Sequence, residues 1–398
     1  MNYKTYAFTC LLLLMSSCSQ QPLTHQVEPI PKILSSCYIV YDAGSSGTRL
    51  YIYEQKSADW VSHEGPKVAA LADPVREIRD KSWTDVDEVI TEVVSALNHI
   101  KQNGSINKKG KPKWKAFDWE KRCHLVSANV FATAGMRIAE QENRYRSSVL
   151  WKKLKQKLQA RLGSSVKVNT RTLSGYEEGL YAWLAVRKNN KGQQFGIAEM
   201  GGASSQVTFP CEHCDTTNDA VKTITLAGKP MKIYSYSFLG LGQDEAPKTL
   251  GLPTSCAYGI GTIKKNWKEA DCAHKISIHN EHGFRDPYNF KQHKKGIHNQ
   301  LPKYISGIKN WYLTGAFNHM DNSQIKTCCL NKGKCYNEKK SCFRSVYLKN
   351  YLKALSISPS SEKMDVSWTS GAVVCAVNDC LQKTAPPPVC RWTDKGCL

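Results

Sequence analysis

Two short segments of this 398-residue chain place a carboxylate, two glycines and two serines in a similar order. Asp42 opens the first, which ends at Thr48, and Glu199 opens the second, which ends at Ser205. A phosphate chain is bound by close backbone N–H groups, by hydroxyls and by a metal that carboxylates hold. Glycine permits the close approach because it lacks a Cβ. Either segment alone fits an ordinary tight turn, but together they indicate a site for phosphates and a divalent metal.

A further carboxylate, Glu178, stands in the first turn of a helix predicted to begin near Ser174. Such a carboxylate can activate a water molecule for attack on phosphorus. It can also do no more than stabilise the helix dipole, as expected for its neighbour Glu177. On the residues alone, the dipole interpretation is favoured for both.

Short apolar strands must position the two carboxylate loops. Residues 38–41 and 50–53 are β-branched or aromatic and flank the first loop, which predicts a hairpin. Residues 195–198 and 206–209 flank the second loop in the same way. This weak internal repeat of strand, loop and strand predicts two loops that face each other across a cleft.

Helices are predicted where apolar residues recur every three to four positions. The clearest pattern covers 84–102, where Thr84 can cap the helix start and Gly104 follows its end. The remaining elements are strands over 124–131 and 166–168, and helices around 150–158, from 174 and over 368–377.

The composition is that of a globular protein with a basic surface. Hydrophobic residues make up 41%, which excludes a disordered chain. The formal net charge is +21. Such a charge attracts nucleotides, nucleic acid or an acidic membrane, but it equally fits a solvated surface. The charge therefore only supports a phosphate site, and no specific nucleic-acid partner is expected.

The first residues have the pattern of an export signal. Residues 1–18 contain an apolar run too short to span a bilayer. The run leads to Cys18 in a sequence that resembles the lipobox of bacterial lipoproteins, where lipid attaches to the cysteine. Ser19 then favours the outer membrane, and 19–35 reads as a polar tether. Because Met15 replaces the usual leucine, we expect either an outer-membrane lipoprotein or a periplasmic, cell-surface or secreted protein.

The cysteines fit export as well. The chain has 16, and setting aside Cys10 and Cys18 leaves 14, enough for up to seven disulfides in an oxidising compartment. Cys211 and Cys214 could form half of a zinc site, but no second pair lies at zinc-ribbon spacing. Disulfides are favoured, with their connectivity open.

Four ordered motifs resemble those of the ecto-apyrase family, the nucleoside triphosphate diphosphohydrolases. They are Asp42-Ala-Gly-Ser-Ser-Gly-Thr-Arg49, Ala132-Thr-Ala-Gly-Met-Arg137, Ser174-Gly-Tyr-Glu-Glu-Gly179 with Trp183, and Met200-Gly-Gly-Ala-Ser-Ser-Gln206. A looser fifth region joins Cys342-Phe-Arg-Ser-Val-Tyr347 with Trp368-Thr-Ser-Gly371. The resemblance covers about residues 37–378.

This resemblance implies a two-lobed α/β protein with an actin-like (ribonuclease-H-like) fold and a nucleotide cleft between the lobes. Lobe I is expected over 36–165, rejoined by 366–398, and lobe II over 166–365. The implied activity is that of an apyrase, in which activated water removes terminal phosphates from nucleoside tri- and diphosphates with Mg²⁺ or Ca²⁺.

The resemblance also implies a role for each site residue. Glu178 would be the general base, with Ser204 and Gln206 positioning the water. The phosphates would be held by Ser45, Ser46, Gly47, Thr48, Gly202, Ala203 and Ser204. The metal would be contacted, mostly through water, by Asp42, Thr133, Glu178, Glu199 and Trp368. Tyr347 and Phe317 are candidates for stacking on the nucleobase, with core packing as the alternative.

One departure and two alternatives remain. The family usually has Asp where this chain has Glu199, whose extra methylene would alter metal choice or rate. An exopolyphosphatase-like enzyme would also cleave a phosphoanhydride chain. A non-catalytic surface protein that binds nucleotides or polyanions would have kept the loops and lost activity through Glu199, but binding alone does not require Glu178, Ser204 and Gln206.

Overall fold

The structure is a computed structural model that describes most of the chain. The described residues are 34–76, 85–107, 110–190, 194–250, 256, 268–282, 284–285, 292–293, 301–320, 329, 341–381, 392–393 and 396–397. The predictions for the export signal, for Cys18, for most of the tether and for the Thr84 cap lie outside these residues. No helix among the described residues is long and apolar enough to cross a membrane.

The first sheet has five strands in the order β3-β2-β1-β4-β5. Strands β1 and β2 form the antiparallel hairpin predicted around the first loop, and β4 and β5 run parallel to β1. The prediction placed β5 in the second lobe, but β5 pairs with β4, since the intervening helices return the chain to the same sheet. The other lobe limits stay a prediction. The strands are β1 Ser35–Gly44, β2 Gly47–Lys56, β3 Asp59–Val68, β4 Cys123–Ala132 and β5 Lys167–Thr172.

Helices with one apolar face supply the core of this sheet. The predicted helix over 84–102 is present as α1, with Asp85 as its cap and its side chain accepting from the Asp87 amide at 2.7 Å. The predicted leucine face around 150–158 is buried on α4. The helices are α1 Val86–His99, α2 Trp119–Arg122, α3 Ala134–Glu142 and α4 Arg144–Leu162.

The second sheet has six strands in the order β13-β12-β6-β7-β9-β8. Strands β6 and β7 form the second predicted hairpin, so each carboxylate loop is the turn of a hairpin. The strands are β6 Phe195–Met200, β7 Ser204–Pro210, β8 Val221–Leu226, β9 Lys229–Leu239, β12 Asn310–Gly315 and β13 Glu362–Lys363.

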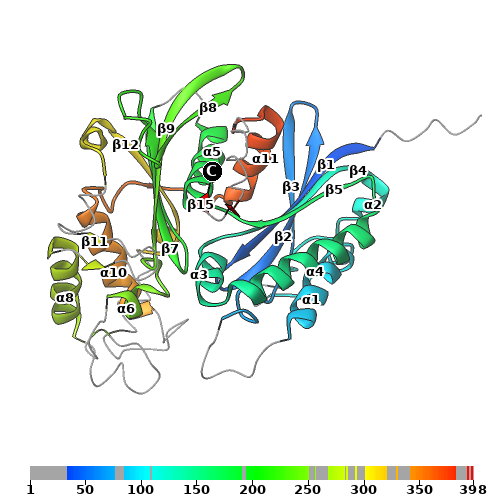
Figure 1. The fold of residues 1–398 in the computed structure, drawn as a ribbon, viewed down its shortest axis with the longest axis horizontal. Helices are drawn as coiled ribbons and strands as arrows, with labels where there is room; N and C mark the ends of the chain where they lie inside the picture. The colour runs from blue at the N-terminus through cyan, green and yellow to red at the C-terminus, as the bar shows by residue number, and fades with distance from the viewer. Residues whose placement is uncertain are drawn as a thin grey trace, which may run out of the picture. The chain divides into compact units, whose positions relative to one another are not determined.

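Two helices, α5 (Gly175–Asn189) and α11 (Trp368–Asn378), lie side by side between the sheets. Figure 1 shows them in green and red, with α5 against β6, β7 and β9 and α11 touching β1, β2 and β8. Their crossing is close, because a Cβ at Gly371 would lie 1.8 Å from the carbonyl oxygen of Tyr181. Both helices confirm the prediction, and their N-terminal turns carry Glu178 and Trp368.

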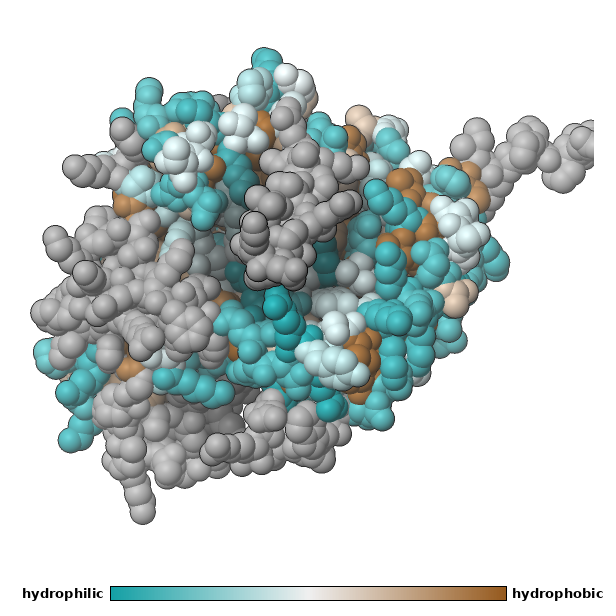
Figure 2. All heavy atoms as spheres, in the orientation of Figure 1, coloured by the Kyte–Doolittle hydropathy of each residue, from teal (hydrophilic) through white to brown (hydrophobic). Residues whose placement is uncertain are grey.

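The other described elements surround the second sheet. The tyrosines and leucines of α10 pack with α8 and η4 into a single core. Figure 2 shows hydrophilic residues over much of the described surface of this face. The elements are α6 Ala246–Thr249, α8 Glu269–His282, β10 Phe284–Arg285, β11 Gln292–His293, η3 Lys303–Gly307, η4 Ala316–His319, α10 Ser341–Ala354, β14 Trp392–Thr393 and β15 Gly396–Cys397.

Disulfides join most of the described cysteines, as predicted. Cys211 and Cys214 bond to each other, which leaves neither thiol for zinc. The other described bridges are Cys37–Cys123, Cys256–Cys272, Cys329–Cys342 and Cys375–Cys380.

Candidate active site

A cavity of about 580 Å³ brings most of the predicted site residues together. It is lined from the first sheet, from the second sheet and from the N-terminal turns of α5 and α11. The predicted residues on its wall are Asp42, Ser45, Ser46, Thr133, Glu178, Glu199, Gly202, Ala203, Ser204 and Trp368.

The two hairpin loops meet at this cavity as closely as their glycines allow. A Cβ at Gly202 would lie 2.3 Å from Ser45 Oγ and 2.9 Å from a carboxylate oxygen of Asp244. On the other side, a Cβ at Gly135 would lie 2.8 Å from Ser45 Cα. The two loops therefore face each other, as the repeat predicted, and both line the cavity, with no Cβ on Gly202 to hold them apart.

Three buried carboxylates, Asp42, Glu178 and Glu199, line the cavity. Burial and the charge of Glu178 raise the pKa of Asp42 to about 7, although Arg49 and a hydrogen bond with Trp368 oppose the shift. Burial and the charges of Glu178 and Asp42 raise the pKa of Glu199 well above its usual value. One oxygen of Glu199, Oε2, is buried without a hydrogen-bond partner. The protein alone leaves this negative charge under-compensated.

A hard divalent cation fits such a set of oxygens, because it would neutralise the carboxylates and satisfy Glu199 Oε2. Within the described part of the chain, no three His, Cys, Asp or Glu side chains lie close enough to hold a metal between them. Thr133 and Trp368, both nearly buried, complete the wall around this place.

Glu178 is held by two donors from different elements. It accepts hydrogen bonds from Arg137 Nη2 at 2.5 Å and from Gln206 Nε2 at 3.0 Å. The same two nitrogens bind Ser204 Oγ, at 3.1 Å and 2.6 Å. Burial raises the pKa of Glu178, while Arg137 and Ser204 oppose the rise. Gln206 lies one layer behind the cavity wall, and its Oε1 is buried without a partner.

The structure separates Glu178 from Glu177, which the residues alone could not. Glu177 forms a capping box with Ser174, whose Oγ accepts from the Glu177 amide, and it also pairs with Arg171. Glu177 is therefore a helix-cap residue. Glu178 instead lines the cavity, so the dipole interpretation favoured for it on the residues alone does not describe its position.

Besides Gln206, the structure places four predicted residues away from the cavity wall. Gly47 turns the first hairpin with φ 147°, and Thr48 is fully buried behind it. The nucleobase-stacking prediction is wrong for Tyr347 and Phe317, because both are fully buried in the core of the second sheet. Tyr347 stacks on Phe343 and donates to the Leu241 carbonyl at 2.7 Å. Core packing accounts for both rings.

Three residues of the site were missed. Arg137 ends the second motif, so its position there was the available signal. Lys67 donates to Ser46 Oγ at 3.1 Å from β3, and Ser237 contacts the Glu178 cluster from β9. Neither of these two lies in a motif, and only strand pairing brings them to the site.

Comparisons with known proteins identify the family of the chain. Residues 120–348, more than half of the chain, match the GDA1/CD39 (nucleoside phosphatase) family. The chain is 27% identical over 245 residues to ectonucleoside triphosphate diphosphohydrolase 1 of Bos taurus, covering 52% of this chain and 41% of that protein. It is 26% identical to the nucleoside-diphosphatase mig-23 of Caenorhabditis elegans, covering 77% and 57%. The chain thus spans about half the length of these relatives.

Solved structures share the fold at low sequence identity. The nucleoside triphosphate hydrolases of Neospora caninum superpose with a TM-score of 0.53 at 13% identity, covering 86% of this chain and 92% of that chain. An exopolyphosphatase from Cytophaga hutchinsonii gives 0.50 at 11%, covering 86% and 98%. These likenesses confirm the two-lobed actin-like α/β fold. Together with the sequence match, they show that the chain belongs to the GDA1/CD39 (nucleoside phosphatase) family.

Proposed function

We propose that this cavity hydrolyses the terminal phosphate of nucleoside tri- and diphosphates by means of an activated water. The observation that carries the proposal is the position of Glu178. It is a buried carboxylate, fixed by Arg137 and Gln206, at the end of a cavity lined by two facing phosphate-type loops. In-line displacement at phosphorus needs a positioned water and neutralised charge, and no covalent nucleophile.

The two loops would hold the phosphate chain between them. Ser45 and Ser46 offer hydroxyls from one side, and the backbone at Gly202 and Ala203 approaches from the other. Lys67, held at Ser46, adds positive charge beside the first loop. The terminal phosphate would then face Glu178.

Glu178 would accept the proton of the attacking water. Arg137 favours the ionised carboxylate, which is the form that a base requires, while burial keeps its proton affinity above that of an exposed glutamate. Ser204 Oγ already accepts two hydrogen bonds, so its own proton can point at the water. The unpartnered Gln206 Oε1 supplies a second acceptor near Glu178. When bound, Mg²⁺ or Ca²⁺ would be held through water by Asp42, Glu199 and Thr133 and would neutralise phosphate charge.

The direct test is phosphate release from ATP and ADP by the full chain with Mg²⁺ or Ca²⁺. We expect release from both nucleotides, loss of release with a chelator, and a decrease of about 10²–10⁴-fold in Glu178→Gln. Glu177→Gln is the matched control, because it makes the same change one residue away in a helix cap. Equal loss in both variants would show that the helix, rather than the base, had been damaged.

The same assay separates the two alternatives. Tripolyphosphate cleaved as well as ATP would favour a polyphosphatase, since the nucleoside would then contribute nothing. Nucleotide binding without any phosphate release would favour the non-catalytic binding protein, and Glu199 would be the residue to replace first.

We also propose that the protein is exported and tethered by lipid at Cys18. The described disulfides support an oxidising compartment. Mass spectrometry of the mature N-terminus tests this proposal. A lipidated Cys18 that is lost in Cys18→Ser supports the tether, whereas an unmodified N-terminus would support a released protein.

A further inference from the structure

Three residues that lie directly opposite one another on neighbouring strands of the second sheet belong to the site, and only two of them lie in the sequence motifs. Glu199 on β6 lies opposite Gln206 on β7, and Gln206 lies opposite Ser237 on β9. Side chains directly opposite on neighbouring strands share a face of the sheet. Ser237 therefore continues the line of two predicted site residues onto a third strand.

The Ser237 hydroxyl joins the two residues that hold the base. Its Oγ accepts from Arg137 Nη1 at 3.2 Å and from Gln206 Nε2 at 3.0 Å. Arg137 and Gln206 are the same two donors that bind Glu178 and Ser204. Ser237 is thus a third acceptor, beside Glu178 and Ser204, that helps to orient the side chains of Arg137 and Gln206.

Gly175 packs closely against the contact between Ser237 and Arg137. A Cβ at Gly175 would lie 2.3 Å from Ser237 Cβ and 2.5 Å from Arg137 Nη1. Gly175 is the first residue of α5, three positions before Glu178. The helix turn that carries the base is therefore packed directly on Ser237.

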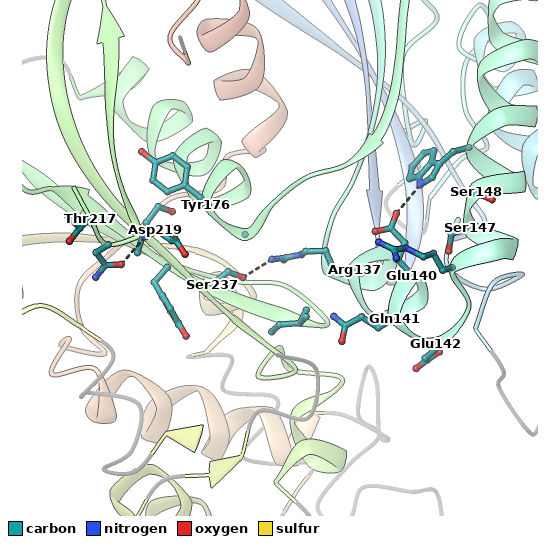
Figure 3. Close-up of a pocket in the computed structure, with 18 residues that line it drawn as sticks. Arg137, Glu140, Gln141, Glu142, Ser147, Ser148, Tyr176, Thr217, Asp219 and Ser237 are labelled. Carbon is teal, nitrogen blue, oxygen red and sulfur yellow. Dashed lines mark hydrogen bonds between the residues drawn. The ribbon is translucent and has the colours of Figure 1, made fainter. Parts of the chain in front are cut away.

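A second cavity explains why Arg137 needs this restraint. The cavity has a volume of about 1360 Å³ and is lined by Arg137, Ser237 and Gly175, none of which lines the catalytic cavity. Figure 3 looks into it and shows Arg137 reaching across to Ser237. Without the Ser237 hydroxyl, Arg137 Nη1 would lose its partner on this side, and only the bonds of Nη2 to Glu178 and Ser204 would hold the guanidinium against this space.

We propose that Ser237 is a positioning residue for the hydrolysis, acting through Arg137 and Gln206 on Glu178 and the attacking water. The inference rests on the proposed function. Ser237 does not line the proposed catalytic cavity, so removal of its hydroxyl should affect the chemical step and leave nucleotide binding nearly intact.

The next row of the same strands offers a matched control. Ser235 lies opposite Thr208, and the two hydroxyls bond to each other at 2.8 Å rather than to Arg137, Gln206 or Glu178. Ser235→Ala and Ser237→Ala therefore remove the same atom from the same face of β9, two residues apart.

The experiment measures kcat and KM for ATP with Mg²⁺, and thermal unfolding, for Ser237→Ala, Ser237→Thr and Ser235→Ala in the full chain. We expect Ser237→Ala to lower kcat about 10–100-fold, as for loss of a hydrogen bond to charged groups, with KM within about threefold. Ser237→Thr keeps the hydroxyl but adds a methyl group beside Gly175, so it should retain more of the rate than Ser237→Ala without reaching that of the wild type. Ser235→Ala should keep a kcat near that of the wild type at a similar unfolding temperature.

Each other outcome has a defined meaning. Equal kcat in Ser237→Ala and wild type would overturn the positioning role, as would an equal decrease in Ser235→Ala. A Ser237→Ala defect confined to KM would also overturn it. A wild-type protein that releases no phosphate contradicts the proposed function itself, whereas an active wild type limits any failure to Ser237.

Discussion

Arg137 Nη2 lies 2.5 Å from Glu178 Oε2, so the helix that follows β4 is bonded to the helix that follows β5. Both side chains are largely buried, at 14% and 8% exposure. The guanidinium also reaches Ser204 and Ser237 on the second sheet. A single cation therefore connects elements of both sheets around the proposed base.

Catalysis should depend on both the charge and the shape of the Arg137 side chain. Arg137→Lys keeps the charge, but an ammonium cannot reproduce a guanidinium fork with fixed directions. We expect kcat for ATP to fall about 10–100-fold in Arg137→Lys and further in Arg137→Met, because the latter leaves a buried carboxylate unpaired. Arg171→Lys changes the neighbouring pair with Glu177 and should stay within about threefold of wild type. If Arg171→Lys loses as much activity as Arg137→Lys, helix stability rather than Glu178 accounts for the effect.

Because the two loops approach closely at Gly202 but not at Gly201, alanine substitutions at these adjacent glycines should affect KM unequally. A Cβ at Gly202 would clash with Ser45 Oγ at 2.3 Å, whereas a Cβ at Gly201 would have its nearest contact at 3.6 Å, an ordinary van der Waals distance. Gly202→Ala should therefore raise KM for ATP about 10-fold or more. The added methyl group would displace Ser45 and its loop from the positions in which they would hold the phosphates. Gly201→Ala should lose clearly less. Equal KM values for the two variants would contradict the close approach.

The sequence predicts the parts of the site that lie near glycines and carboxylates. The hairpin turns that follow Asp42 and Glu199, and the helix that begins at Ser174, have local signals and are present as predicted. These segments obey short-range rules, since strand alternation, turn residues and helix caps are all encoded within a few positions. The facing of the two loops followed from their repetition.

Other features depend on pairing between distant segments and carry no local signal. Ser237 sits in a strand that no motif marks, and it enters the site only because β9 pairs with β7. The aromatic ring of Tyr347 could equally have faced a ligand or the core, and only its helix packing decides. The placement of β5 failed for the same reason, because the choice of sheet depends on tertiary contacts.

Replacement of Glu199 should have opposite effects on two properties: it should raise the stability of the metal-free protein and remove the stabilisation by Mg²⁺. Glu199→Gln removes a buried carboxylate that Glu178 and Asp42 repel. With a chelator present, the free energy of unfolding of this variant should therefore exceed that of the wild type by at least about 1 kcal/mol. The same change should abolish the rise in unfolding temperature that Mg²⁺ gives the wild type. Glu199→Asp keeps the charge and should keep the metal response. A wild-type and a Glu199→Gln protein of equal stability in chelator would show that the carboxylates do not repel one another as described.

Another buried carboxylate, Glu54 on β2, is compensated by two cations, Lys56 and Arg122, and by a hydrogen bond with His63, whose pKa burial lowers. It is 1% exposed and pairs with Lys56 at 2.8 Å, His63 at 3.0 Å and Arg122 at 2.8 Å. Burial alone would raise its pKa, but the hydrogen bonds from these three residues lower it to about 2. The cluster lies outside both cavities, so it affects stability and leaves the chemistry unchanged.

Because the pKa of Glu54 is lower in the folded protein than its usual 4.5, its contribution to stability is complete above about pH 5 and is lost as the pH falls towards 2. Glu54→Gln should lower the free energy of unfolding by about 1–3 kcal/mol at pH 7, since the three donors lose a charged acceptor. The difference from wild type should shrink as the pH falls from 5 to 3, measured by urea unfolding. Asp118→Asn removes an exposed pair with Lys121 and should cost no more than about 1 kcal/mol. A Glu54→Gln deficit that stays constant down to pH 3 would mean that the ionised carboxylate does not stabilise the fold.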